Sequence, residues 1–195
     1  TTYKNRYKYS GNFYFNYQVT KEGEKNLPDY SVTKNFKVQW SHRTDPKASP
    51  NSSFSASVNF ATQSYEKNNL TSLYNPTSYS QSTRTSSISY SHTFQKIGLS
   101  MSSSFNISQN MRDSTIALTM PSLSLSLSRF YPFKRKVRVG KERFYEKFSI
   151  GYNTTLQNKI NFKASEFGQE GFLDRFQNGM THNFSIGLPN FQILK

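Results

Sequence analysis

The basic residues of this chain are the side chains whose type and spacing could do chemistry, and that chemistry is the binding of anions. Six cations fall between positions 134 and 143, in a segment bounded by the aromatic residues Phe133 and Phe144. Clustered cations at a membrane surface bind lipid phosphates, although an ordinary solvated loop carries the same charges. A further lysine, Lys37, stands in the polar phase of an alternating segment, between Asn35 and Gln39. The candidate ligands for an anionic headgroup are therefore Lys37, Lys134, Arg135, Lys136 and Arg138.

Catalytic chemistry finds little support in the sequence. The three histidines, His42, His92 and His182, are far apart, and each falls among the apolar positions of its segment. There is no HExxH motif, and no two carboxylates stand at positions suited to acid–base catalysis. Serine is so common in the chain that a serine near a histidine does not indicate a catalytic nucleophile. We therefore predict no enzyme, no cofactor and no metal site. An outer-membrane hydrolase is the enzymatic alternative, and packing or rim positions are the simplest roles for the histidines.

The elements that position the basic residues are strands with strict two-residue alternation. Phe54, Ala56, Val58 and Phe60 alternate with small polar residues, and the same pattern recurs near 87–94 and 99–107. Successive side chains of a strand point to opposite faces, so each segment has one apolar and one polar face. The polar positions are uniformly Ser, Thr and Asn, which favours a polar channel wall over the outer surface of a soluble sandwich.

Composition narrows the class of protein. Only 34% of the 195 residues are hydrophobic and the mean hydropathy is -0.75, yet aromatic residues make up 16%. Disordered chains are poor in aromatics, whereas a transmembrane β-barrel needs an apolar residue only at every second position. No run of 18 apolar residues predicts a membrane helix, and the absence of cysteine excludes disulfides.

The net charge of +14 predicts attraction to nucleic acid, anionic lipid or a phosphorylated glycolipid. Interleaved basic and aromatic residues also suit a surface that stacks nucleic-acid bases. Such surfaces concentrate on one small fold, whereas here the pattern runs along the whole chain without an RNA-binding motif. An anionic lipid partner is therefore favoured and nucleic acid is not.

The alternation predicts ten strands, several of them long enough for a tilted strand to cross a bilayer. Tight connections are expected at Ser10-Gly11, 96–98, 110–114 and Gln157-Asn158, and the clearest surface loop at 67–82. In an up-and-down barrel, long and short connections should alternate along the chain. The expected connections do not alternate throughout, so either one strand is miscounted or both rims carry short loops. The expected strands lie near 3–9, 12–20, 32–43, 52–65, 83–95, 97–109, 115–129, 145–156, 159–166 and 179–194.

The segment near 115–129 changes phase in its middle. Ile116 and Leu118 occupy one phase, Leu123 and Leu125 the opposite one, and Pro121 stands at the switch. Proline in a sheet is confined to edges and bulges. A β-bulge inserts one residue and would return both halves to the same face, so we predict a bulge here.

A specific likeness is carried by the segment from Thr115 to Lys147, TIALTMPSLSLSLSRFYPFKRK followed by VGKERFYEK, and by FKVQWSH with DPKA after it near 36–48. These stretches resemble the barrel portion of the LPS-assembly protein family (LptD/OstA) in its Bacteroidota-type form. The resemblance implies an antiparallel transmembrane β-barrel of the Gram-negative outer membrane. It also implies transport of lipopolysaccharide to the outer leaflet, with an LptE-like lipoprotein as partner.

We expect residues 1–195 to form one outer-membrane β-barrel segment without a second domain, an internal part of the wall of a larger barrel. The expected partners are lipopolysaccharide or a similar anionic glycolipid, and outer-membrane lipid. The alternatives are another outer-membrane transporter or pore, and a secreted β-sandwich adhesin.

Overall fold

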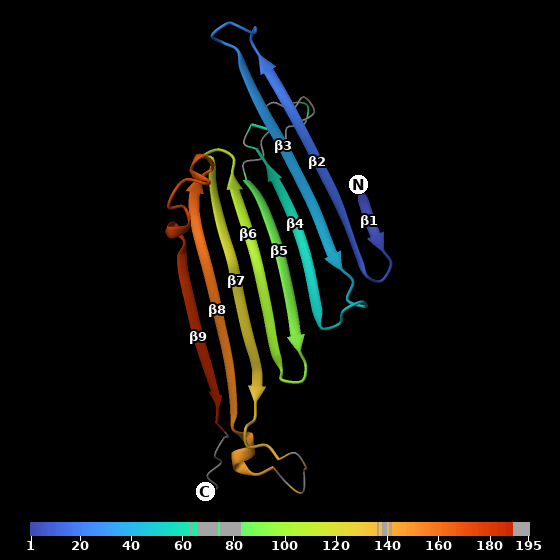
Figure 1. Cartoon of the computed structure of the whole chain (residues 1–195). Helices are drawn as coiled ribbons and strands as arrows, with labels where there is room; N and C mark the ends of the chain where they lie inside the picture. Colours follow the sequence, from blue (N-terminus) through green and yellow to red (C-terminus); the bar gives the residue numbers. More distant parts are fainter. Residues whose placement is uncertain are drawn as a thin grey trace.

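The chain folds as one antiparallel sheet of nine strands, in which each strand pairs with its neighbours in sequence (Figure 1). The computed structural model describes residues 1–62, 64–65, 74, 83–135, 137, 140 and 142–188. Within this part of the chain there is no α-helix. The strands are β1 Thr2–Asn5, β2 Tyr9–Glu22, β3 Ser31–Thr44, β4 Ser52–Ala61, β5 Thr83–Phe94, β6 Leu99–Asn110, β7 Thr115–Phe130, β8 Ser149–Lys163 and β9 Gln177–Gly187, and the loops contain the 3-10 helices η1 Phe144–Lys147, η2 Ala164–Glu166 and η3 Leu173–Arg175.

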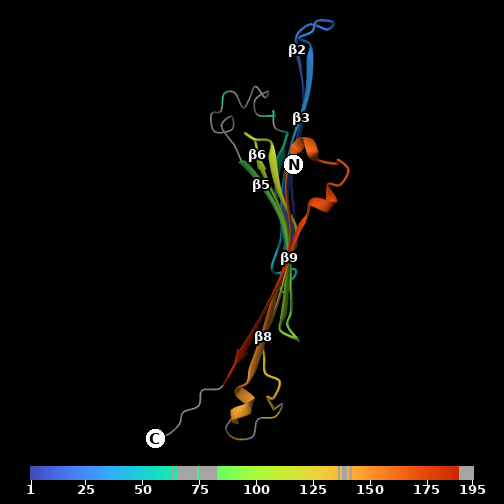
Figure 2. The same cartoon turned by 90° about the vertical axis from the view of Figure 1, so that its left-hand side faces the viewer.

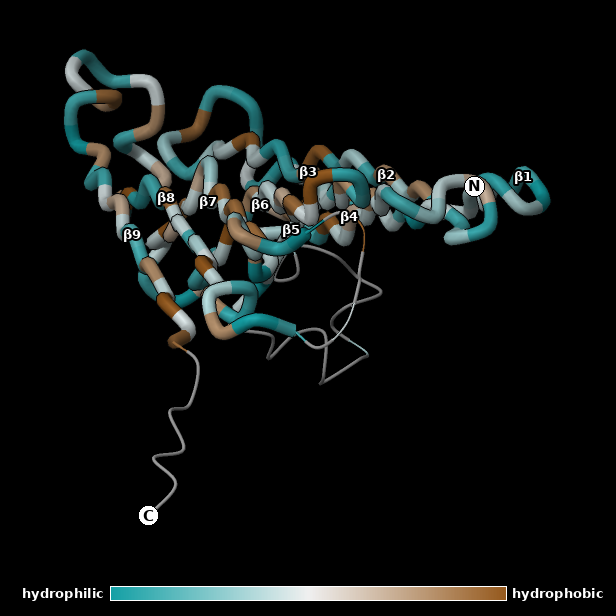
Figure 3. Tube along the Cα trace, turned by 90° about the horizontal axis from the view of Figure 1, so that it is seen from below, coloured by the Kyte–Doolittle hydropathy of each residue, from teal (hydrophilic) through white to brown (hydrophobic). Residues whose placement is uncertain are grey.

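The sheet is a single open layer. Seen edge-on it is thin and twisted (Figure 2), as the right-handed twist of strands requires. Seen along the strands it shows one layer in which hydrophobic and hydrophilic positions alternate (Figure 3). No second sheet covers it within the described residues, and β1 and β9 form its two edges. The prediction of an antiparallel all-β fold is confirmed, and the sheet is not closed.

None of the described residues belongs to a helix with the length and hydropathy of a membrane span.

The strands expected at 3–9 and 12–20 have different bounds in the structure. The turn joining β1 to β2 lies at 6–8, where Tyr7 has a φ of 62° and the Lys8 amide donates to the Asn5 carbonyl at 3.0 Å. The predicted turn at Ser10-Gly11 is therefore wrong. Gly11 lies within β2 opposite Tyr3, and a Cβ at this glycine would collide with the Tyr3 ring. Glycine here serves the close approach of an aromatic ring rather than a turn.

The strands expected at 145–156 and 159–166 are a single strand, β8. Gln157 and Asn158 continue the ladder with β9, opposite Gly179 and Asn178. The predicted connection at Gln157-Asn158 is wrong because pairing with the neighbouring strands overrides the local turn preference of these residues. Because the two expected strands are one, the sheet has nine strands and not the ten expected from the sequence.

The bulge predicted in the proline-containing strand is confirmed. Between Thr119 and Ser122 the register of β7 shifts by one residue against both β6 and β8. Pro121 lies inside this irregularity, and the Met120–Pro121 peptide is cis. As a result Leu118 and Leu123 both lie on the apolar face, opposite Ile160 and Leu156 of β8.

The upper halves of β4 and β5 are joined through side chains. Backbone pairing between these strands covers only 52–57 and 87–92. Above it the backbone N–H of Asn59 donates to the Ser86 hydroxyl of β5 at 3.0 Å. The side-chain amide of Gln109, which belongs to β6, bonds both the N–H and the carbonyl of Ala61 at 3.4 Å. Arg84, 1% exposed, donates to the Asn59 side chain at 2.8 Å. The sequence alone does not predict these side-chain bonds, because the polar residues that form them continue the alternating pattern of their strands.

The loops form two rims, called lower and upper after their place in Figure 1. The lower rim comprises the described residues of the loops 6–8, 45–51, 95–98 and 131–148, together with the two strand residues on each side of every loop. The upper rim comprises the described residues of the loops 23–30, 62–82, 111–114 and 164–176, defined in the same way. Short connections therefore occur at both rims. Most of the predicted loop at 67–82 lies outside the described residues.

Candidate anionic-lipid surface

The register of the strands gives the sheet a hydroxyl-rich polar face. Ser55 of β4 lies opposite Ser89 of β5, which lies opposite Ser104 of β6. The hydroxyls of neighbouring strands bond to one another, with Ser53 to Ser91 at 2.8 Å and Ser55 to Ser89 at 2.7 Å. This face therefore presents rows of groups that both donate and accept hydrogen bonds.

The opposite face is apolar and uncovered. Trp40 of β3 lies opposite Val58 of β4, and Leu127 of β7 lies opposite Tyr152 of β8. Toward the edges its side chains are openly exposed, for example Phe15 at 56% and Phe184 at 71%. An exposed apolar surface of this extent requires a partner, and for a single-layer sheet hydrocarbon is a suitable one.

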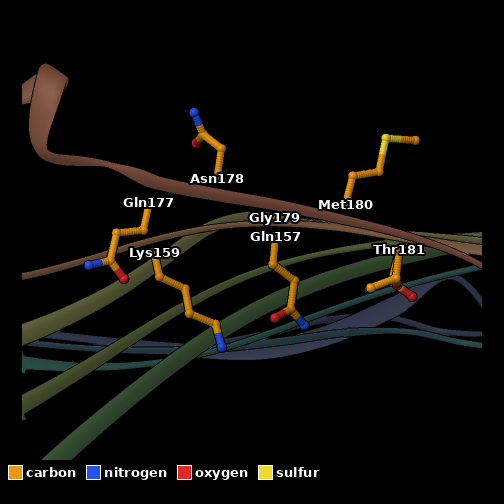
Figure 4. A pocket seen from close by; sticks show the side chains of 8 residues that line it. Gln157, Lys159, Gln177, Asn178, Gly179, Met180 and Thr181 are labelled. Atoms are coloured by element: carbon orange, nitrogen blue, oxygen red, sulfur yellow. The ribbon is translucent and has the colours of Figure 1, made fainter.

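The hollow along the β8–β9 edge shows this alternation in side-chain detail. It has a volume of about 500 Å³ and is lined by Gln157 and Lys159 of β8 and by residues 177–181 of β9. In Figure 4 the side chains of Gln157, Lys159 and Gln177 point to one side of the sheet, whereas Asn178 and Met180 point to the other. The hollow borders β9, which forms one edge of the sheet.

Lys37 lies on the polar face in the upper half of β3, opposite Ala61 of β4. Its ammonium nitrogen is 5.5 Å from the centre of the Tyr65 ring, which is 2% exposed. The adjacent Asn35 is fully buried and its side-chain oxygen accepts bonds from the Thr62 and Ser64 hydroxyls at 3.1 and 2.8 Å. Lys37 is thus one cation in a hydrogen-bonded polar cluster.

Lys134 and Arg135 lie at the other end of the sheet, in the lower-rim loop between β7 and β8. The Lys134 ammonium is 5.2 Å from the centre of the Tyr131 ring, which is a cation–π arrangement. Such amphipathic aromatic rings suit the level of the lipid headgroups in a membrane. The Arg135 guanidinium donates to both carboxylate oxygens of Glu146, so its charge is already paired. Lys136 and Arg138 lie outside the described residues.

The structure therefore separates the predicted residues into two places: Lys37 belongs to the upper half of β3, and Lys134 and Arg135 to the lower rim. It also reveals basic groups that belong with the lower rim. In the β1–β2 turn the Tyr7 ring has Arg6 at 4.8 Å and Lys47 at 5.2 Å from its centre. Sequence reasoning missed this cluster because residues 6 and 47 meet only through the pairing of β2 with β3.

The two rims differ in charge. Among the described residues, the lower rim contains eleven basic and three acidic residues, and the upper rim six basic and seven acidic ones. Most of the net positive charge of the described residues is thus at one end of the sheet. The basic residues of the lower rim are Lys4, Arg6, Lys8, Arg43, Lys47, Lys96, Arg129, Lys134, Arg135, Arg143 and Lys147, and its acidic residues are Asp45, Glu142 and Glu146.

Glu146 organises the loop that contains Lys134. The hydrogen bond from Arg135 lowers the pKa of this carboxyl group, and the backbone N–H of Arg143, at 2.9 Å, lowers it further. A carboxyl group with a lowered pKa stabilises the folded loop above its unfolded pKa of about 4.3. This contribution is lost as the pH falls through the lower, folded value.

We expect the loop to lose this stabilisation progressively as the pH falls below the unfolded pKa of about 4.3 and through the lower pKa of the folded state. Amide hydrogen exchange of Arg143, corrected for its intrinsic pH dependence, should accelerate there in the wild type. The Glu146→Gln variant should exchange rapidly already at pH 7, and Glu170→Gln, at an exposed carboxylate of the upper rim, should behave as wild type. Equal protection of Arg143 in the Glu146 variant and the wild type at pH 7 would contradict the role assigned to the ion pair.

The histidines pack within the apolar face or lie at exposed positions on it. The Tyr3 hydroxyl is 2.8 Å from His42 Nδ1 and accepts a bond of 2.8 Å from the Trp40 indole, and the Tyr152 hydroxyl is 2.8 Å from His182 Nδ1. No group of three or more His, Cys, Asp or Glu residues able to hold a metal ion occurs among the described residues.

A family model described as LptD protein matches residues 1–195. No curated protein and no solved structure matches the chain. The resemblance drawn from residues 115–147 and 36–48 is confirmed by this match. The chain therefore belongs to the LptD family of lipopolysaccharide-transport proteins of the Gram-negative outer membrane.

Proposed function

We propose that this chain forms part of the wall of an outer-membrane barrel that translocates lipopolysaccharide to the outer leaflet. The observation that carries the proposal is the two-faced single sheet, with rows of hydroxyl groups on one face and an uncovered apolar surface on the other. The polar face would line the lumen and contact the sugar and phosphate groups of the glycolipid. The apolar face would seal the wall against hydrocarbon.

In this proposal the transport needs no covalent chemistry, and the cations supply electrostatic attraction. Lys37 would contact the headgroup within the lumen, and Lys134 and Arg135 would contact it at the lower rim. Lys136 and Arg138, which lie outside the described residues, belong to the same proposed set of ligands. The two unpaired edges, β1 and β9, would continue into further strands of the same barrel. An LptE-like lipoprotein is the expected protein partner.

The two alternatives make different demands on the sheet. A secreted β-sandwich buries its apolar face against a second sheet, and none is present among the described residues. A small pore or nutrient transporter formed by this chain alone requires a closed barrel, whereas β1 and β9 stand at opposite edges. Transport of a glycolipid by a larger barrel fits both observations.

Crosslinking from adjacent positions of β4 tests the proposal. A photo-reactive residue at Ser57, exposed on the polar face, should capture lipopolysaccharide, and only while the cell supplies it. The matched control is Val58, one residue along and on the apolar face, whose crosslinks to membrane lipid should not depend on that supply. Supply-dependent capture from Val58 and none from Ser57 would refute the proposed function.

A further inference from the structure

We propose that the lower rim holds a binding site for a phosphorylated sugar, centred on Arg43 at the end of β3. The inference rests on the proposed function and names the part of the glycolipid that this face recognises, namely its sugar-phosphate headgroup. The site is a hollow of about 510 Å³ on the polar face, lined by Arg43, Asn51, Ser53, Ser55, Ser91 and Thr93 among others. None of these residues belongs to the β7–β8 loop, which contains Lys134 and Arg135.

Strand register brings the hydroxyl groups of the hollow together. Ser55 lies opposite Arg43 on one side and Ser89 on the other, and Ser53 lies opposite Ser91. At the lower end the Asn51 side chain accepts a bond from the Gln95 amide at 2.7 Å, which joins the β3–β4 and β5–β6 loops. Hydroxyl and amide groups match the donors and acceptors of a sugar. Phe54 of β4 also lines the hollow. Its ring packs against the rings of Trp40 and His42, with centroids 6.4 and 5.5 Å away, so it does not form an open stacking platform for nucleic-acid bases.

Arg43 supplies the charge. Its side chain is exposed and forms no hydrogen bond or ion pair with any described residue. A guanidinium offers a planar pair of N–H donors that fits a phosphate. An uncompensated arginine at the border of a hydroxyl-lined hollow is the arrangement expected for a phosphate attached to a sugar, since one part of the site binds charge and the other binds hydroxyls.

A second, smaller hollow lies on the other side of Arg43. It has a volume of about 180 Å³ and is also lined by Lys4, Tyr7 and Asp45. Lys4 belongs to the same row of the polar face as Arg43, because both lie opposite Ser10. The Asp45 carboxylate, which accepts the Lys47 amide at 2.9 Å, borders only this smaller hollow and repels a phosphate there. The phosphate therefore belongs on the side of Arg43 that faces the larger hollow, with Lys4 attracting it at longer range.

The charge of the lower rim supports this location. Eleven basic residues against three acidic ones concentrate anions at this end of the sheet before any specific contact forms. The upper rim has six basic and seven acidic residues among those described, so it does not attract anions in this way.

Binding to the full-length protein in detergent tests the site with three probes: a bis-phosphorylated glucosamine disaccharide, the same disaccharide without phosphate, and inorganic phosphate. The wild type should bind the phosphorylated disaccharide most tightly. Arg43→Gln should weaken this binding about tenfold or more, as the loss of a charge-assisted hydrogen bond predicts. Arg112→Gln, at an exposed arginine of the upper rim, should leave it unchanged.

A double variant, Ser53→Ala with Ser91→Ala, separates recognition of the sugar from recognition of charge. It should weaken binding of the disaccharide while leaving the weak binding of inorganic phosphate unchanged. Equal affinity of Arg43→Gln and wild type for the phosphorylated disaccharide would overturn the site. So would wild-type affinity for inorganic phosphate equal to that for the phosphorylated disaccharide. If crosslinking from Ser57 succeeds while either result is found, only the Arg43 site is lost and the proposed function stands.

Discussion

Replacing Leu125 with arginine should prevent assembly of the barrel in the membrane, whereas the same replacement at Ser124 should be tolerated. Leu125 lies on the apolar face, opposite Met101 of β6 and Thr154 of β8. An arginine on the lipid face of a barrel costs about 2–4 kcal/mol at the bilayer midplane. At Ser124 the arginine would project from the polar face, where the long side chain reaches water.

The measurement is the fraction of full-length protein that folds in lipid vesicles, read from the shift in gel mobility of the folded barrel. Val58→Arg should behave like the Leu125 variant, because Val58 lies on the same face opposite Trp40. If both apolar-face variants fold as well as Ser124→Arg, hydrocarbon does not cover this face and the assignment of the faces is wrong.

Deletion of Pro121 should be tolerated, whereas deletion of Ser124 should abolish assembly. The bulge adds one residue to β7 relative to both neighbouring strands. Without Pro121 the strand becomes regular. Ile116 and Leu123 then come into one phase and stay on the same face. Without Ser124 the phase changes at a point that has no compensating bulge, and Leu125 and Leu127 turn to the polar face. Each displaced leucine loses about 1.5–3 kcal/mol of favourable burial in an apolar environment.

The two deletions remove one residue each from the same strand, so each controls for the shortening caused by the other. Folding in vesicles and protease resistance of the assembled barrel are the readouts. Equal failure of both variants would show that the bulge has a role beyond restoring the phase. Equal success would show that the phase of this strand does not matter for assembly.

The local pattern was enough to predict which side chains share a face. Alternation over two residues is a property of the strand itself, so Phe54, Val58 and Phe60 could be assigned to one face without knowledge of their neighbours. The bulge at Pro121 was also predictable, because the change of phase and the residue that causes it are adjacent in sequence. The family likeness was carried by contiguous segments for the same reason.

Strand ends and turns were less predictable. Ser10-Gly11 and Gln157-Asn158 have the composition of turns, yet both lie inside strands. In each case the deciding interactions come from residues distant in sequence: the Tyr3 ring against Gly11, and the strand β9 against Gln157. Ladder pairing satisfies backbone groups at every position, and this outweighs a weak local preference for a turn.

The sequence alone determined that the chain forms two-faced strands, that it carries a large positive charge, and that it belongs among lipopolysaccharide-transport proteins. Only the tertiary structure decided where the charges gather. It placed Lys37 far from the β7–β8 loop, paired Arg135 with Glu146, and set Arg43 beside Ser55 at the lower rim. The physical reason is that alternation follows from the geometry of a single strand, whereas proximity across a sheet follows from register, which depends on the lengths of all intervening turns.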